Sequence, residues 1–169
     1  MVENRAAAQP ATPPTLEQAI AMVKVGQNFA AAVPAGIVAS IVGAGLWALT
    51  VFVTQMKLGL IAIAVGALVG YAIRKAGKGI DQKFGILGAI CAALGWGLGT
   101  MLSDVAFLAK HVGRPFGDVL MSLGLDGTIS FVTRAADPMD LLFLGIAVYE
   151  GYKLSFRYRL KKTPPARSA

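Results

Sequence analysis

The sequence predicts an all-α membrane protein, a bundle of four transmembrane helices with short amphipathic interfacial helices. Val25–Met56 is a run of 32 residues without a charged side chain, and two further uncharged runs cover Leu58–Ile73 and Phe84–Ser103. A helix rises about 1.5 Å per residue, so roughly 20 apolar residues cross a bilayer core about 30 Å thick. In hydrocarbon the backbone must satisfy its own hydrogen bonds, which favours helices for these runs.

The composition agrees with a membrane location. Hydrophobic residues make up 56% of the chain and charged residues 15%, with a mean hydropathy of +0.64, whereas soluble domains carry about 25% charged residues. The net charge of +7 would suit nucleic acid, but the basic residues flank apolar runs, where such residues set orientation and meet anionic head groups. We therefore expect membrane lipids as partners and no nucleic acid.

The chain divides into a flexible start, an interfacial helix, the bundle and a tail. Residues 1–14 are rich in alanine and proline and are expected to be disordered, as is the basic tail 161–169. Residues 15–33 are expected to form an amphipathic helix at the interface, opened by a capping box at Thr15 and Gln18. The bundle is expected over 34–160, with spans at about 34–55, 58–75, 84–103 and 139–157. Pro34 suits the first turn of the first span.

Counting basic residues decides between three spans and four. With four spans and both termini inside, twelve Lys and Arg residues lie inside and four outside. Three spans would carry the basic tail across the membrane, against the positive-inside rule. We therefore expect four spans with cytoplasmic N- and C-termini, although Glu150 and Lys153 interrupt the fourth.

The outer loop, residues 104–138, contains a predicted amphipathic helix. Phe116, Val119, Leu120 and Leu123 recur at helical spacing. Pro115 suits the start of this helix and Gly124 its end. The helix is expected either to act as a lid or docking element or simply to bury its apolar face at the bilayer.

Small residues are expected to hold the bundle together, because lipid offers no hydrophobic drive for helices to associate. The second span has Gly66 and Gly70 four residues apart, and the third has small residues on two ridges, which predicts a central position for it. The two ridges are Gly85, Ala89, Ala93 and Gly97, and Cys91, Gly95, Gly99 and Ser103. Whether a ridge remains for a second copy of the chain is open.

The sequence shows no catalytic constellation. His111 is the single histidine of the sequence and Cys91 its single cysteine. The sequence contains no H-E-x-x-H motif and no phosphate loop. We therefore expect no enzyme, cofactor or metal site. Glu150 is the one candidate for intramembrane chemistry, such as proton or ion passage. The alternatives are that it pairs with Lys153, three residues on, or lies at the cytoplasmic interface.

Two blocks resemble a family of small uncharacterised bacterial inner-membrane proteins with four spans. The first is Val69–Asp81 with Lys83–Gly85 and Gly88-Ala89, and the second joins Asp140–Phe143 to Ala147–Lys153. The resemblance covers roughly residues 34–158 and implies the bacterial inner (cytoplasmic) membrane and this topology. Some relatives begin with a cytoplasmic zinc ribbon, whose cysteines are missing here. The family has no assigned activity, so the resemblance implies no functional residues.

The basic tip between the second and third spans is the main candidate surface. It carries Arg74, Lys75, Lys78 and Lys83, which are expected to contact acidic lipid or a cytoplasmic partner, or to serve only as a positive-inside anchor. Gly77 and Gly79 are expected to let the chain reverse, and Asp81 to pair with a neighbouring base.

The function expected from these features is a non-enzymatic anchoring or assembly component. The alternative is a small oligomeric channel or transporter subunit with Glu150 near its path. A homo-oligomer and a complex with another membrane subunit both remain open, and the sequence names neither substrate nor partner.

Overall fold

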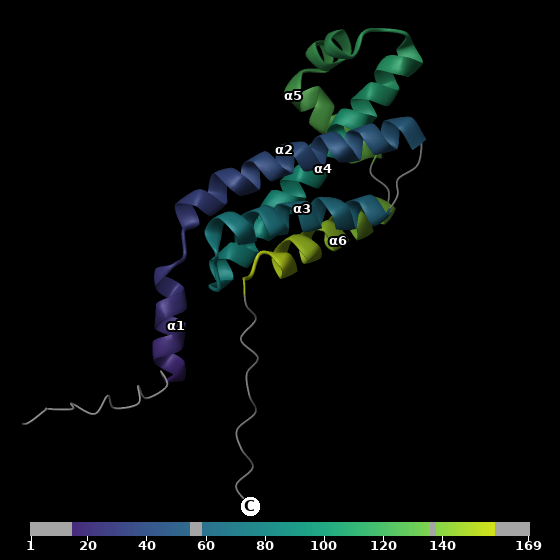
Figure 1. Ribbon diagram of the computed structural model, residues 1–169. Helices are drawn as coiled ribbons and strands as arrows, with labels where there is room; N and C mark the ends of the chain where they lie inside the picture. Colours follow the sequence, from purple (N-terminus) through teal and green to yellow (C-terminus); the bar gives the residue numbers. More distant parts are fainter. Residues whose placement is uncertain (1–14, 55–58, 136–137, 158–169) are drawn as a thin grey trace, which may run out of the picture.

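The structure is a computed structural model that describes residues 15–54, 59–135 and 138–157 (Figure 1). These residues form six helices and no strand, which confirms the all-α prediction. The expected disorder of 1–14 and 161–169 concerns residues outside the described ranges. The helices are α1 (Leu16–Val25), α2 (Phe29–Thr54), α3 (Gly59–Gly77), α4 (Gln82–Val112), α5 (Phe116–Ala135) and α6 (Pro138–Leu154).

The segment 15–33 differs from the single interfacial helix that was expected. The predicted capping box is confirmed, since the Thr15 side chain accepts from the Gln18 backbone and the Gln18 side chain accepts in return. However, α1 ends at Gly26, and α2 begins at Phe29 after Asn28, whose side-chain oxygen caps the new helix. Pro34 therefore lies inside α2, not in the first turn of a span starting at 34.

The third long helix extends beyond its expected end. α4 has 31 residues, about 46 Å at 1.5 Å per residue, and so exceeds the thickness of a bilayer core. It ends only at Gly113, which has the left-handed φ of 67° typical of a helix terminus. Residues 104–112, expected in the outer loop, are thus helical.

α5 packs on this extension of α4. Val119 of α5 is buried in a cluster with Val105 and Ala109 of α4, and α4 is the helix of the bundle that α5 contacts. The predicted end at Gly124 is confirmed, because Gly124 has non-helical angles (φ 62°) that divide α5 into two parts. The amphipathic element therefore covers the end of one helix.

α3 and α4 form the centre of the bundle. They contact each other, and each contacts both α2 and α6. Figure 1 shows α2 and α6 on either side of this pair, with α5 at one end of the bundle and α1 at the other. The predicted central position of the third span is therefore correct, although α3 shares it.

α4 approaches α2 through the ridge that contains Gly95 and Gly99. A Cβ placed on Gly95 would lie 3.0 Å from the Ser40 carbonyl oxygen, and one on Gly99 would lie 2.8 Å from the Cβ of Trp47. The Ser40 hydroxyl donates across this contact to the carbonyl oxygen of Cys91, 2.7 Å away. Glycine allows the two backbones to come close enough for that bond.

α6 packs parallel to α3 through a second set of small residues. A Cβ on Gly66 would overlap the carbonyl oxygen of Ala147, and one on Gly70 would lie 2.8 Å from the Cβ of Leu154. Residue numbers on both helices increase along the contact, so the two helices run in the same direction. The predicted Gly66-x-x-x-Gly70 pattern thus lies at the α3–α6 contact.

The ridge of α4 that faces α6 differs from the four-residue repeat read in the sequence. The contact is made by Gly88 and Ala92, which pack on Gly151 of α6, and by Gly85 beside Tyr152. A row at four-residue spacing turns by about 40° per step around a helix of 3.6 residues per turn, so the predicted row leaves the contact. Its later members Ala89, Ala93 and Gly97 are only half-buried.

The outward surface of the bundle is apolar. Large side chains such as Ile41 and Leu49 of α2, Ile90 of α4 and Leu141 of α6 are each more than half exposed. Soluble proteins rarely expose continuous apolar surface of this kind, but hydrocarbon accommodates it. By length and composition α2, α3 and α4 suffice to cross a membrane, whereas α6 has only 17 residues.

Replacing Gly95 with leucine is expected to destabilise the detergent-extracted protein by about 1–3 kcal/mol, because the added side chain has no space between α4 and α2. Gly97→Leu is the matched control, since a Cβ there meets no heavy atom within 4 Å among the described residues. Thermal melting followed by circular dichroism measures both variants. Equal melting temperatures would contradict the α2–α4 contact.

Candidate functional site

One end of the bundle brings together the start of α2, the α3–α4 connection and the exit from α6. The Asn28 N–H donates to the Gly77 carbonyl at 2.8 Å, and the Arg157 N–H donates to the Gly79 carbonyl at 2.9 Å. This end, which we call the basic end, lies opposite α5 (Figure 1). It is defined by the basic residues Lys24, Arg74, Lys75, Lys78, Lys83 and Arg157.

Three of the four basic residues singled out in the sequence line one pocket. Arg74, Lys75 and Lys78 form it with Tyr71 and Arg157, and its volume is about 330 Å³. Within the described part of the chain, the lining contains four cations and no carboxylate. We call this group the basic pocket. Arg157, the last residue of the predicted fourth span (139–157), was not singled out from the sequence, because sequence spacing does not show that α6 places it beside the end of α3.

Lys83, the fourth predicted residue, lies apart from the basic pocket. Its Nζ is 3.8 Å from Asp81 Oδ2 and 5.5 Å from the centre of the Phe29 ring. The other oxygen of Asp81 lies 3.7 Å from Lys24 Nζ, so the expected pairing of Asp81 with a neighbouring base is confirmed. Since these side chains are partly exposed, the pairs contribute little stability, but they set Lys24 and Lys83 apart from the cations that line the basic pocket.

The turn after α3 places Lys78 in a left-handed conformation. Among the described residues Lys78 is the one non-glycine with positive φ, at 48°, and its N–H donates to the Arg74 carbonyl at 3.0 Å. Gly77 and Gly79 lie in the reversal between α3 and α4, where they were expected, but neither has positive φ. They are needed because a Cβ on either would overlap the ring of Phe84. A left-handed lysine costs about 1–2 kcal/mol, and strain of this kind clusters at functional sites.

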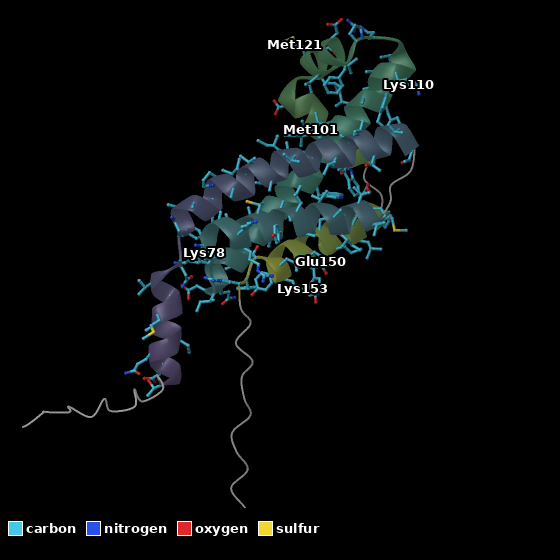
Figure 2. The ribbon with its side chains drawn as sticks, viewed as in Figure 1. Lys78, Met101, Lys110, Met121, Glu150 and Lys153 are labelled. Atoms are coloured by element: carbon cyan, nitrogen blue, oxygen red, sulfur yellow. The ribbon has the colours of Figure 1, made fainter. Side chains whose placement is uncertain are left out.

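Glu150 and Lys153 pair on α6, as one of the alternatives predicted. Lys153 Nζ lies 3.5 Å from Glu150 Oε1 and 5.3 Å from the centre of the Tyr149 ring. Figure 2 shows both side chains on α6, with Lys78 and Lys110 toward opposite ends of the bundle.

Packing on α3 shows how far along the bundle Glu150 lies. A Cβ on Gly66 would be 3.0 Å from the Glu150 Cβ. Gly66 is seven residues from the start of α3 and eleven from its end, about 10 Å and about 16 Å along the axis. The carboxylate therefore lies beside the middle of a helix that is long and apolar enough to cross a membrane.

The remaining reactive side chains form no cluster. Cys91 is buried at the α2–α4 contact, and His111 is exposed in the last turn of α4. Within the described ranges no group of three His, Cys, Asp or Glu residues is placed to hold a metal ion. The arrangement is suited to binding charged groups at the basic pocket.

Comparison with protein-family models, with curated proteins and with solved structures finds no match for this chain.

Lys78→Gly is expected to stabilise the detergent-extracted protein by about 1 kcal/mol, because glycine adopts positive φ without the clash that a Cβ brings. Thermal melting without added lipid measures this change. Lys75→Gly, one turn earlier in the regular part of α3, is the control and should destabilise by a similar amount. A lower melting temperature for Lys78→Gly would show that the lysine side chain itself stabilises the turn.

Proposed function

We propose that this chain is a four-span protein of the bacterial inner membrane, with both termini in the cytoplasm, that serves as a non-enzymatic anchoring or assembly component. The support comes from the contacts of α6 along the whole of α3, the distribution of charge and the position of α1. The sequence resemblance to four-span inner-membrane proteins favours the same location.

The length of α3 along which α6 packs supports a fourth span. Gly59, at the start of α3, lies against Phe143, and Gly70 lies against Leu154. After α6, the backbone bond between Arg157 and Gly79 extends the match past the end of α3. If α3 crosses the bilayer, a segment that follows it in parallel along this length crosses the bilayer too.

The distribution of charge supports the orientation. Six basic residues define the basic end, whereas the described part of the opposite end carries three, namely Lys110 and Arg114 around the end of α4 and Arg134 in α5. An excess of Lys and Arg marks the cytoplasmic side. The proposed orientation therefore places the basic end, α1 and the exit from α6 in the cytoplasm.

The position of α1 is the observation that carries the anchoring role. Among the described residues α1 packs on no other helix, and Figure 1 shows it standing away from the bundle. The Lys24–Asp81 pair joins its last turn to the basic end, while Met22 and Val25 are largely exposed. A helix held at the membrane surface with exposed apolar side chains is suited to docking a partner or the interface.

The proposal predicts a stable complex with a second membrane polypeptide that depends on α1. Native mass spectrometry of membranes solubilised in mild detergent measures it. Met22→Glu/Val25→Glu should reduce the complex at least tenfold, because both side chains are exposed and the bundle does not need them. Met121→Glu/Ile129→Glu, on the exposed surface of α5, is the matched control and should leave the complex intact.

A small oligomeric channel is the second candidate, and the position of Glu150 beside the middle of α3 favours it. A closed homo-oligomer without a foreign subunit, together with a proton flux in liposomes that Glu150→Gln abolishes, would replace the anchoring proposal. A monomer without flux would contradict both candidates.

A further inference from the structure

The basic pocket concentrates positive charge at the C-terminal end of α3. Arg74 and Lys75 are exposed in the last turn of α3, and Lys78 follows in the strained turn. Arg157 arrives from the other side of the pocket, where its N–H is bonded to the Gly79 carbonyl. Two segments distant in the sequence therefore build a single cationic cavity, whose backbone is held by that hydrogen bond.

The cations of the pocket are not those that Asp81 neutralises. Asp81 pairs with Lys24 and Lys83, and neither of these lysines lines the pocket. Glu150 pairs with Lys153, one turn before Arg157. Among the residues that the structure describes, the pocket lining therefore combines four cations with no acidic residue, which is the charge pattern of a site for a phosphate group.

The surface of α3 that leads into the pocket is apolar and faces outward. Leu60, Ile63 and Tyr71 are exposed, with exposed fractions of 73%, 42% and 57%, and their spacing places them along one side of the helix. The opposite side carries Val65 and Val69, which are buried in the bundle. We call the exposed side the α3 stripe.

Tyr71 joins the α3 stripe to the pocket. It lines the pocket, and its ring centre lies 5.8 Å from Lys75 Nζ. Tyrosine is enriched where a helix leaves the hydrocarbon. One ligand that carries a phosphate and a long apolar chain matches the pocket and the stripe together, whereas a soluble phosphate matches only the pocket.

We propose that the basic pocket binds the phosphodiester of one anionic phospholipid, whose acyl chain lies against the α3 stripe. Basic pockets beside transmembrane helices on the cytoplasmic side are typical sites for such head groups. This inference deepens the proposed function and rests on its placement of the basic end at the cytoplasmic leaflet. It names the lipid that would hold this end of the bundle at the membrane.

The test is titration of the delipidated full chain in detergent with phosphatidylglycerol, measured by native mass spectrometry. Arg74→Gln/Arg157→Gln should weaken binding at least tenfold, because it removes charge from both sides of the pocket. Lys24→Gln/Lys83→Gln removes the same charge from the same end of the bundle and should change binding less than twofold. Lys75→Gln is the second variant if the double variant folds poorly, and should weaken binding at least threefold.

Further ligands separate the sources of phosphate. Phosphatidylcholine should bind at least tenfold more weakly than phosphatidylglycerol, and sn-glycerol 3-phosphate or inorganic phosphate should not compete at millimolar concentration. Competition by inorganic phosphate would overturn the lipid assignment in favour of a soluble anion. Equal losses in the two double variants would overturn the pocket in favour of diffuse attraction. Neither outcome involves the α1-dependent complex, so this proposal and the anchoring role fail separately.

Discussion

Close approach of helix backbones through glycine is the constraint on which the structure depends. α6 is the shortest helix of the bundle and carries three charged side chains, so hydrophobic length alone does not hold it in place. It is held where Gly66 and Gly70 of α3 and Gly88 of α4 leave room for the backbone around Ala147 and Gly151. In a lipid solvent such contacts provide van der Waals packing that larger side chains would prevent.

Two features of the candidate sites follow from that contact. Because α6 runs parallel to α3, Glu150 lies beside the middle of α3 and Arg157 lies beside its end. The first position places an ion pair beside the middle of a helix that is long and apolar enough to cross a membrane, and the second completes a cationic pocket. The basic pocket is therefore a consequence of helix packing, and the basic residues of the α3–α4 turn alone do not form it.

The sequence predicts the helical class, the central third span and the break at Gly124, because apolar runs and isolated glycines are local signals. It does not predict which small residues meet which helix. The four-residue row that begins at Gly85 turns away from α6, and the real contact uses Gly88. It places the turn after α3 but does not show why the turn needs its glycines, because the space occupied by Phe84 and the positive φ of Lys78 depend on tertiary packing. Nor does the sequence predict the basic pocket, because one of its residues, Arg157, is brought there by a contact with Gly79, which lies 78 residues earlier in the chain.

The most direct measurement is the accessibility of three positions in intact cells to a membrane-impermeant maleimide or protease. The positions are Gln82→Cys at the start of α4, Gly117→Cys at the start of α5, and a tag at the C-terminus. The native Cys91 is buried and should stay unlabelled. A fourth span that follows α3 predicts that Gly117→Cys alone reacts, while Gln82→Cys and the tag react only after lysis. A C-terminal tag that is reachable together with Gly117→Cys would show that α6 does not cross the membrane, and would contradict this account.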